Sequence, residues 1–293
     1  MKKFYQIGSV CIEVEIPEMM QIPQNMKLFE IPEKDIDQKE NWRYYRMEIV
    51  DTFSNVEETF IQGHSDVKVI EHPDLKILYT KEQECRLIRF SGDEQPYAIY
   101  LNGETETTYV WVHRKVLDML FYDTIFLSMF GLEKEMLRDA SMILHSAYIV
   151  KDGKAILFSA PSETGKSTQA SLWEKYRGAK IVNGDRSLLK CDDGIWYAHG
   201  WPICGSSEIC HNESYPIRAI VMLYQSKENV VRRLGGAEAV KKVFSQIMVN
   251  MWNKDNVVTA LDLVQQLAMN VPVFELGCTI SEEAVECLER IIK

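Results

Sequence analysis

The residues best suited to chemistry lie in one stretch, between Lys154 and Asp185. A short apolar run, Ala155–Phe158, predicts a buried strand there. It leads into small and charged residues: Ser162, Glu163, Thr164, Gly165, Lys166, Ser167 and Thr168. A polyphosphate chain needs many short hydrogen-bond donors and little steric bulk, and the backbone N–H groups of such a loop supply both at a helix N-terminus. In this arrangement Lys166 reaches the outer phosphates and the Ser167 hydroxyl ligates Mg²⁺.

The spacing comes close to the phosphate-loop pattern G-x-x-x-x-G-K-[ST]. Gly165, Lys166 and Ser167 are in register, and Ala160 stands where the first glycine is expected. Alanine is the smallest replacement, and it tolerates most turn geometries except a positive φ. A G-K-S-T tetrapeptide also occurs by chance at ordinary helix starts. Here strand, loop, helix and a downstream acid follow in order, which favours a phosphate loop.

Two further elements must position this loop. The helix that follows it carries Leu172, Trp173 and Tyr176 on one side, and Gly178 stands where a left-handed C-cap is expected. A second buried strand, predicted over 180–182, then delivers Asp185 at its end. Ligands in α/β sheets gather outside the carboxyl ends of strands, so we expect Asp185 to meet what Lys166 and Ser167 hold.

The order of these pieces resembles a known family. The run His145-Ser146-Ala147-Tyr148-Ile149-Val150 is followed by Gly153, the strand, the S-E-T-G-K-S-T loop and Asn183-Gly184-Asp185-Arg186. This arrangement is similar to the catalytic core of HPr kinase/phosphorylase and of the wider HPr-kinase-like group. That group shares a phosphate-loop fold with ATP-dependent phosphoenolpyruvate carboxykinase. The resemblance covers roughly residue 143 to the C-terminus.

The resemblance implies a phosphotransferase that uses Mg²⁺ and ATP to phosphorylate a hydroxyl, with a peptide or protein as the expected acceptor. It assigns acid–base chemistry to His145, phosphate binding to Lys166, and Mg²⁺ binding to Ser167 and Asp185. The proton of the acceptor then goes to His145 or Asp185. An Asp-Asp pair is expected after the second strand, but this chain has Gly184-Asp185.

The missing first carboxylate leaves two other functions open. One is a non-catalytic nucleotide-binding partner protein that retains the fold but has a degenerate kinase site. The other is phosphatase or phosphorylase activity at the same site, because enzymes of the family run the reaction in both directions. The sequence does not distinguish ATP from GTP or pyrophosphate.

The sequence predicts an α/β protein with two regions. Residues 141–293 form a P-loop nucleotide-binding domain of the HPr kinase/phosphoenolpyruvate carboxykinase type, and residues 1–140 form a smaller β-rich region. Near the end of this region, residues 116–130 are apolar nearly all round, which predicts one buried helix that ends at Gly131. The alternative is a helix face between two copies of the chain, in a homo-oligomer. Three amphipathic helices are expected near the C-terminus, the first with a face that runs from Val240 to Met251.

Composition narrows the class of protein. The chain has 293 residues and a formal net charge of −10, which argues against a nucleic-acid partner. Its apolar runs are short and its first residues lack an apolar signal core, so no membrane span is expected. Seven cysteines without a C-x-x-C pair favour reduced thiols and a cytoplasmic location. One cluster of potential metal ligands could alternatively form a zinc site: His199, Cys204, Cys210 and His211.

Overall fold

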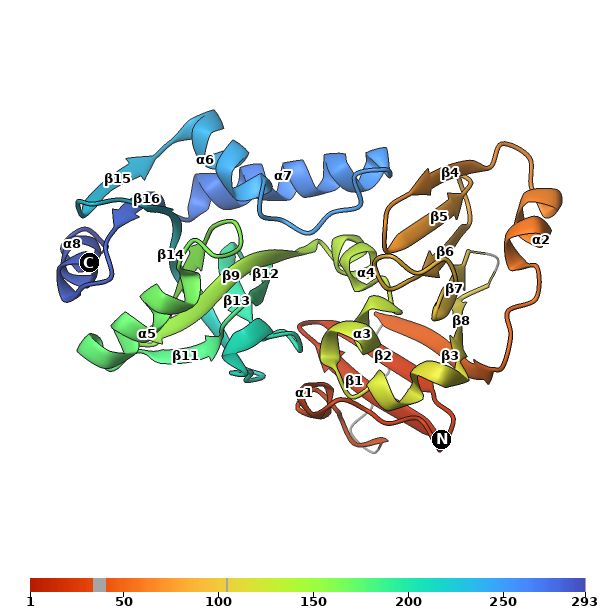
Figure 1. Cartoon of the computed structure of the whole chain (residues 1–293). Coiled ribbons are helices and arrows are strands. Elements are labelled where there is room, and N and C mark those ends of the chain that lie inside the picture. Colours follow the sequence, from red (N-terminus) through yellow and green to blue (C-terminus); the bar gives the residue numbers. More distant parts are fainter. Residues whose placement is uncertain (34–40, 104, 293) are drawn as a thin grey trace. The chain divides into compact units, whose positions relative to one another are not determined.

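The computed structural model describes residues 1–33, 41–103 and 105–292. Within it the chain forms two compact units, Met1–Leu132 and Glu133–Lys293. Each unit is built on its own eight-stranded sheet (Figure 1). The boundary predicted from the sequence, after residue 140, lies just before the first strand of the second unit. The structure is therefore a mixed α/β fold with two large sheets.

The first unit is a mixed sheet with the strand order β1-β2-β3-β8-β7-β6-β5-β4. Its strands are β1 (Lys2–Ile7), β2 (Val10–Glu15), β3 (Trp42–Val50), β4 (Lys68–Glu71), β5 (Leu75–Tyr79), β6 (Glu84–Ile88), β7 (Ala98–Asn102) and β8 (Thr107–His113). β3 is parallel to both of its neighbours, β2 and β8, and the other pairs are antiparallel. The β-rich character expected of this region is therefore present.

The single buried helix predicted over 116–130 is wrong. Two short helices occupy the segment, the 3₁₀ helix η2 (Arg114–Met119) and α3 (Asp123–Ser128). Between them the chain turns, with Tyr122 in an extended conformation and both Phe121 and Tyr122 exposed. A segment that is apolar nearly all round carries no 3.6-residue period, so the pattern could not locate this break. The unit also contains α1 (Gln24–Lys27) and α2 (Val56–Gly63).

The second unit has the strand order β10-β9-β12-β13-β14-β16-β15, with β11 paired to β9 and β10 also paired to β14. Its strands are β9 (Ser141–Lys151), β10 (Lys154–Ser159), β11 (Lys180–Asn183), β12 (Arg186–Asp192), β13 (Ile195–His199), β14 (Ser214–Gln225), β15 (Val230–Leu234) and β16 (Val273–Cys278). β14 is parallel to both β10 and β16. Since β10 and β11 are both antiparallel to β9, the carboxyl ends of β10, β11, β14 and β16 all point the same way.

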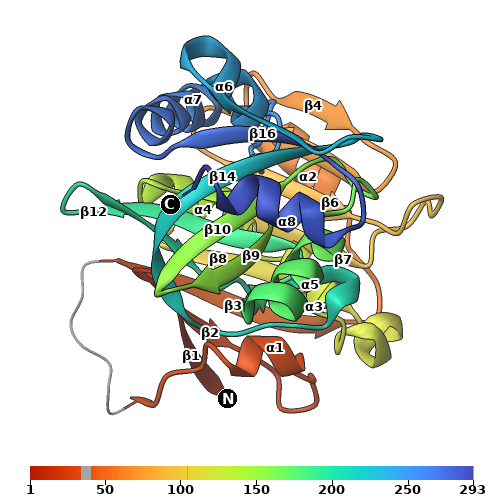
Figure 2. The same cartoon turned by 90° about the vertical axis from the view of Figure 1, so that its left-hand side faces the viewer.

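Helices cover both faces of this sheet (Figure 2). The helices of this unit are α4 (Leu132–Arg138), α5 (Lys166–Arg177), α6 (Gly236–Phe244), α7 (Lys254–Asn270), α8 (Glu282–Glu289) and the 3₁₀ helix η3 (Gly205–Ser207). Ala155 and Leu157 of β10 pack in one core cluster with α6 and α7, whereas Ile156 and Phe158 pack in another with α5 and α8. This alternation is the two-residue period of a strand buried on both faces. None of the helices in the described ranges is long and apolar enough to cross a membrane.

The first C-terminal helix is shorter than predicted. α6 ends at Phe244, whereas the predicted face extended to Met251. The next residues run along β9 instead, with Ile247 bridged to Leu144 and the carbonyl of Gln246 accepting the N–H of His145 at 2.9 Å. Backbone pairing to β9 competes here with continuation of the helix, and hydrophobic periodicity does not reveal such pairing.

Candidate functional site

The loop from β10 to α5 has the backbone of a tight strand-to-helix turn. Gly165 precedes the helix at φ 113° and Glu163 lies in the left-handed region at φ 63°. Ala160 is buried and its φ is not positive, so alanine fits the first motif position without strain. α5 ends at Arg177, and Gly178 adopts the left-handed C-cap conformation that its sequence position predicts.

The side chain of Lys166 hydrogen-bonds to the start of this loop. The side chain is buried, and its Nζ donates to the carbonyl oxygens of Ala160 at 3.0 Å and Pro161 at 3.2 Å. Burial lowers the pKa of Lys166, and the negative charge of Asp185 opposes that shift. A buried ammonium whose partners are neutral carbonyls gains strongly from an anion, so phosphate oxygens are better acceptors for it than the loop itself.

Ser167 connects the loop to the second half of the site. Its Oγ donates to the carbonyl oxygen of Gly184 at 3.3 Å, which brings the first turn of α5 next to the residue before Asp185. The other predicted loop residues line the mouth of the turn: Ser162 and Glu163 are exposed, whereas Thr164 and Thr168 are half-buried. The structure thus gathers Lys166, Ser167 and Asp185 in one place.

His145 stands where β9 changes partners. Up to His145 the strand pairs with β12, and from Ser146 onward it pairs with β10. This junction places the His145 Nε2 atom 3.2 Å from Asp185 Oδ1, while Arg186 Nε lies 3.2 Å from Asp185 Oδ2. Both carboxylate oxygens of Asp185 therefore have a basic partner.

The charges around Asp185 favour its ionised form. Burial by itself raises the pKa of this carboxyl, but the hydrogen bond from His145 and the charges of Arg186 and Lys166 outweigh it and hold the pKa below its ordinary value. Burial also lowers the pKa of Arg186. A carboxylate of low pKa is suited to ligating a metal ion or orienting a neighbour, and it is a weak proton acceptor.

The turn that carries Asp185 is built by Asn183, a residue that sequence reasoning did not single out. The Asn183 side chain is fully buried, and its Oδ1 accepts the backbone N–H groups of Asp185 and Arg186, each at 2.9 Å. Its Nδ2 donates to the carbonyl oxygens of Trp201 at 2.7 Å and Ile203 at 3.1 Å. A strand that ends in Asn and then Gly was the available signal for such a turn.

The segment of η3 fills the space next to Gly184. A Cβ atom added at Gly184 would overlap the Ser207 side chain, and one added at Gly205 would lie 3.0 Å from Asp185 Cβ. Ser207 is held there because its Oγ donates to the carbonyl oxygen of Cys204 at 2.7 Å. Position 184 therefore carries no carboxylate, and the Ser207 side chain fills the space that such a side chain would need.

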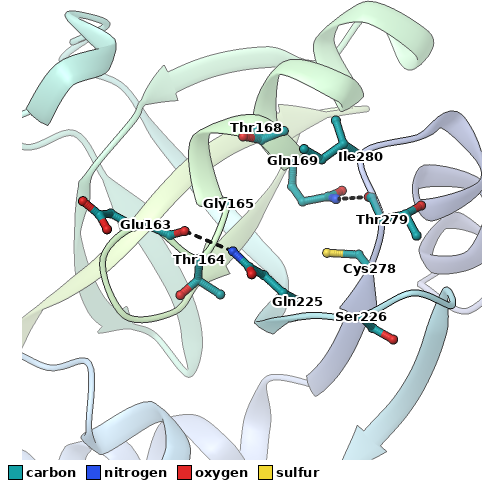
Figure 3. A pocket seen from close by; sticks show the side chains of 10 residues that line it. All are labelled: Glu163, Thr164, Gly165, Thr168, Gln169, Gln225, Ser226, Cys278, Thr279 and Ile280. Carbon is teal, nitrogen blue, oxygen red and sulfur yellow. Dashed lines mark hydrogen bonds between the residues drawn. The ribbon is translucent and has the colours of Figure 1, made fainter.

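A cavity of about 410 Å³ opens beside the loop from β10 to α5, where the carboxyl ends of β10, β14 and β16 meet (Figure 3). Ten residues line it: Glu163, Thr164, Gly165, Thr168, Gln169, Gln225, Ser226, Cys278, Thr279 and Ile280. Sequence analysis predicted the first four of them as phosphate-binding residues and missed the other six. Those six come from α5 and from the carboxyl ends of β14 and β16 with the residues that follow them, and the parallel pairing of the strands brings them together.

The zinc alternative finds no support in the geometry. Within the part of the chain that the structure describes, no group of three or more His, Cys, Asp and Glu side chains could hold a metal ion. His199 instead shares a hydrogen bond with Ser214 Oγ through its Nδ1, at 2.7 Å. Cys210 Sγ donates to the carbonyl oxygen of Trp201 at 3.3 Å.

Together the fold and the site define a class of protein. It is a mixed α/β protein whose second unit carries a glycine-bearing loop between a buried strand and a helix, with an acidic turn beside it. The chain belongs to the family described as SynChlorMet cassette protein ScmC, whose family model matches residues 123–293.

No curated protein matches the chain. Among solved structures, it is similar to the Hpr(Ser) kinase/phosphatase from Coxiella burnetii, with 12% sequence identity and a TM-score of 0.31. That likeness covers 50% of this chain and 90% of the other.

Proposed function

We propose that this protein is an ATP- and Mg²⁺-dependent phosphotransferase that phosphorylates a hydroxyl group of a peptide or protein. The observation that carries the proposal is the convergence of Lys166, Ser167 and Asp185 at the junction of the phosphate loop and the acidic turn. The 3.3 Å hydrogen bond from Ser167 Oγ to the carbonyl of Gly184 joins the two. Phosphoryl transfer depends mainly on positioning and charge neutralisation, and these three side chains are of the types that supply both.

The phosphates would lie over the N-terminus of α5. Backbone N–H groups from Gly165 onward donate to them, and the Nζ of Lys166 exchanges its loop carbonyls for phosphate oxygens. Ser167 and Asp185 would hold Mg²⁺, which when bound neutralises charge on the outer phosphates. The ionised state of Asp185 suits this role.

The acceptor hydroxyl must lose a proton as its oxygen bonds to the γ-phosphorus and the bond to the β-phosphate oxygen breaks. We assign that proton to His145. Asp185, being anionic, favours the tautomer of His145 in which Nε2 carries hydrogen and donates to Oδ1 at 3.2 Å. The Nδ1 atom then has a free electron pair for the acceptor proton. Arg186 keeps Asp185 ionised and adds a positive charge near the transferred group.

The test uses water as the acceptor, so no peptide needs to be known. We expect slow, Mg²⁺-dependent release of phosphate from ATP by the wild-type protein, and a loss of about 100-fold or more in Asp185→Asn. The matched control is Asp192→Asn, which changes an exposed acid in the β12–β13 hairpin of the same unit. Wild-type turnover in Asp185→Asn would overturn the metal and orienting roles of Asp185.

A non-catalytic nucleotide-binding partner is the second candidate, and the closed space at Gly184 favours it. If the loss of that carboxylate ended catalysis, selection would no longer keep the space open, and the Ser207 side chain could occupy it. This candidate predicts nucleotide binding that depends on Lys166 but no phosphate release in any variant. The phosphate-release measurement therefore separates the two candidates.

A further inference from the structure

The cavity beside the phosphate loop extends beyond the residues that would bind phosphate, and its far wall has no role in phosphate binding. The loop itself, Glu163 to Gly165, forms one side, and Thr168 and Gln169 of α5 form the next. The far wall is the segment Cys278–Ile280, at the carboxyl end of β16. A nucleotide whose phosphates lie on the loop has its sugar and base within reach of this space, and about 410 Å³ is an ordinary size for a small-ligand site.

Gln169 carries the feature that points to a ligand. The residue is only 2% exposed, and its Nε2 donates to the carbonyl oxygen of Thr279 at 3.2 Å (Figure 3). Its other amide atom, Oε1, is buried and has no hydrogen-bond partner among the described residues. A buried acceptor without a donor is costly, so a ligand N–H that reaches it is bound favourably.

The far wall supplies a rigid partner and an apolar surface. Thr279 is fixed by Asn229, whose Oδ1 accepts the Thr279 backbone N–H at 2.8 Å and its hydroxyl at 3.2 Å. The next residue, Ile280, lies at the rim of the cavity with its side chain 80% exposed. A large exposed aliphatic side chain next to a buried acceptor matches a flat ring that has an apolar face and an N–H group on its edge.

We propose that the cavity binds the purine base of the nucleotide and that Gln169 Oε1 accepts a hydrogen bond from an exocyclic amino group of that base. Gln169 is then a residue that determines nucleotide specificity. This inference rests on the proposed function, because it requires the phosphates to lie on the loop. Two purines carry such a group, adenine at C6 and guanine at C2, and the amino group is the chemistry that they share.

The test removes the amino group from the ligand and keeps everything else. Affinities are measured by calorimetry for ATP against purine riboside triphosphate, and for GTP against inosine triphosphate. We expect loss of the amino group to weaken binding by about tenfold or more in the pair that contains the preferred nucleotide. A difference in affinity between ATP and purine riboside triphosphate would identify adenine as the preferred base. A difference between GTP and inosine triphosphate would identify guanine.

The variant Gln169→Met should bind the two members of that pair about equally, because it lacks the acceptor. Gln265→Met is the matched control: Gln265 is an exposed glutamine on α7 and does not line the cavity. This control should keep the wild-type preference. Equal affinities within both pairs for the wild-type protein, or an unchanged preference in Gln169→Met, would overturn the assignment.

Inorganic tripolyphosphate separates a failure of this inference from a failure of the proposed function. It presents the phosphates without a base, so Gln169→Met should bind it as the wild-type protein does, which also shows that the variant is folded. If tripolyphosphate and nucleotides bind in a Lys166-dependent way but no pair is distinguished, only the role of Gln169 is contradicted. If neither binds, the proposed function is contradicted as well.

Discussion

Ser207 occupies the space that a side chain at Gly184 would need. A Cβ atom at position 184 would overlap both Oγ and Cβ of Ser207, and the Ser207 hydroxyl is held in place by the carbonyl of Cys204 at 2.7 Å. The residue before Asp185 is therefore fixed as glycine by packing, independently of any requirement of catalysis.

A double-mutant cycle tests this packing. We expect Gly184→Ala to lower the free energy of unfolding by about 2 kcal/mol in the wild-type background, because the new methyl group overpacks a closed site. In the Ser207→Gly background the same change should cost close to nothing, since its obstacle is gone. Urea unfolding of the four proteins measures both values. Equal costs in the two backgrounds would show that Ser207 is not the obstacle.

His199 should make the protein less stable in mild acid. Its side chain is half-buried and its Nε2 has no hydrogen-bond partner among the described residues, and partial burial lowers its pKa from the ordinary 6.5. The unfolded chain then binds a proton that the folded chain does not, and stability is lost as the pH falls below about 6.5, by at most about 1.4 kcal/mol per pH unit.

Urea unfolding between pH 7.5 and pH 5.5 measures this loss. In His199→Gln the pH dependence should become shallower, whereas His211→Gln, which changes an exposed histidine of the same unit, should keep the wild-type dependence. If His199→Gln retained the full wild-type slope, some other group would be the source of the acid sensitivity.

The alkylation rate of Cys278 should show directly whether nucleotide occupies the cavity. Its thiol lines the cavity beside the loop from β10 to α5, and burial raises its pKa although the Gln169 amide partly opposes that shift. Since the thiolate is the reactive form, we expect slow alkylation at pH 7.5 and a marked increase above the usual thiol range. Bound nucleotide should slow the reaction by about tenfold or more by covering the thiol.

Peptide mapping after iodoacetamide treatment gives the labelling rate at each cysteine. Cys191, half-buried on β12, is the internal control, and its rate should not change with nucleotide. Equal labelling of Cys278 with and without nucleotide, under conditions where binding is demonstrated, would place the base outside this cavity.

The local elements of the site could be predicted because their signals are short-range. The apolar run of β10, the small residues of the loop and the Gly178 cap lie within 25 residues of one another in the sequence. The loop and the acidic turn also lie where the sequence places them, next to each other. Each of these depends on backbone preferences or strand period, which a single sequence displays.

The remainder depends on contacts between distant segments. Gln169 directly follows the predicted loop, but its burial arises from the segment after β16, 110 residues further on. In the same way, the sequence shows only that Gly184 replaces an expected carboxylate. The reason that glycine is needed there, the packing of Ser207 against it, comes from a distant segment. The break between η2 and α3 was missed because uniform hydrophobicity carries no period.

The most direct test of the account is a calorimetric titration with MgATP. Wild-type protein should bind, and Lys166→Ala should bind at least about tenfold more weakly, because a buried ammonium and its charge-assisted hydrogen bonds to phosphate are lost. Lys175→Ala, an exposed lysine further along α5, should bind as the wild type does. Absence of binding to the wild-type protein, or undiminished binding to Lys166→Ala, would contradict the assignment of this loop to phosphate.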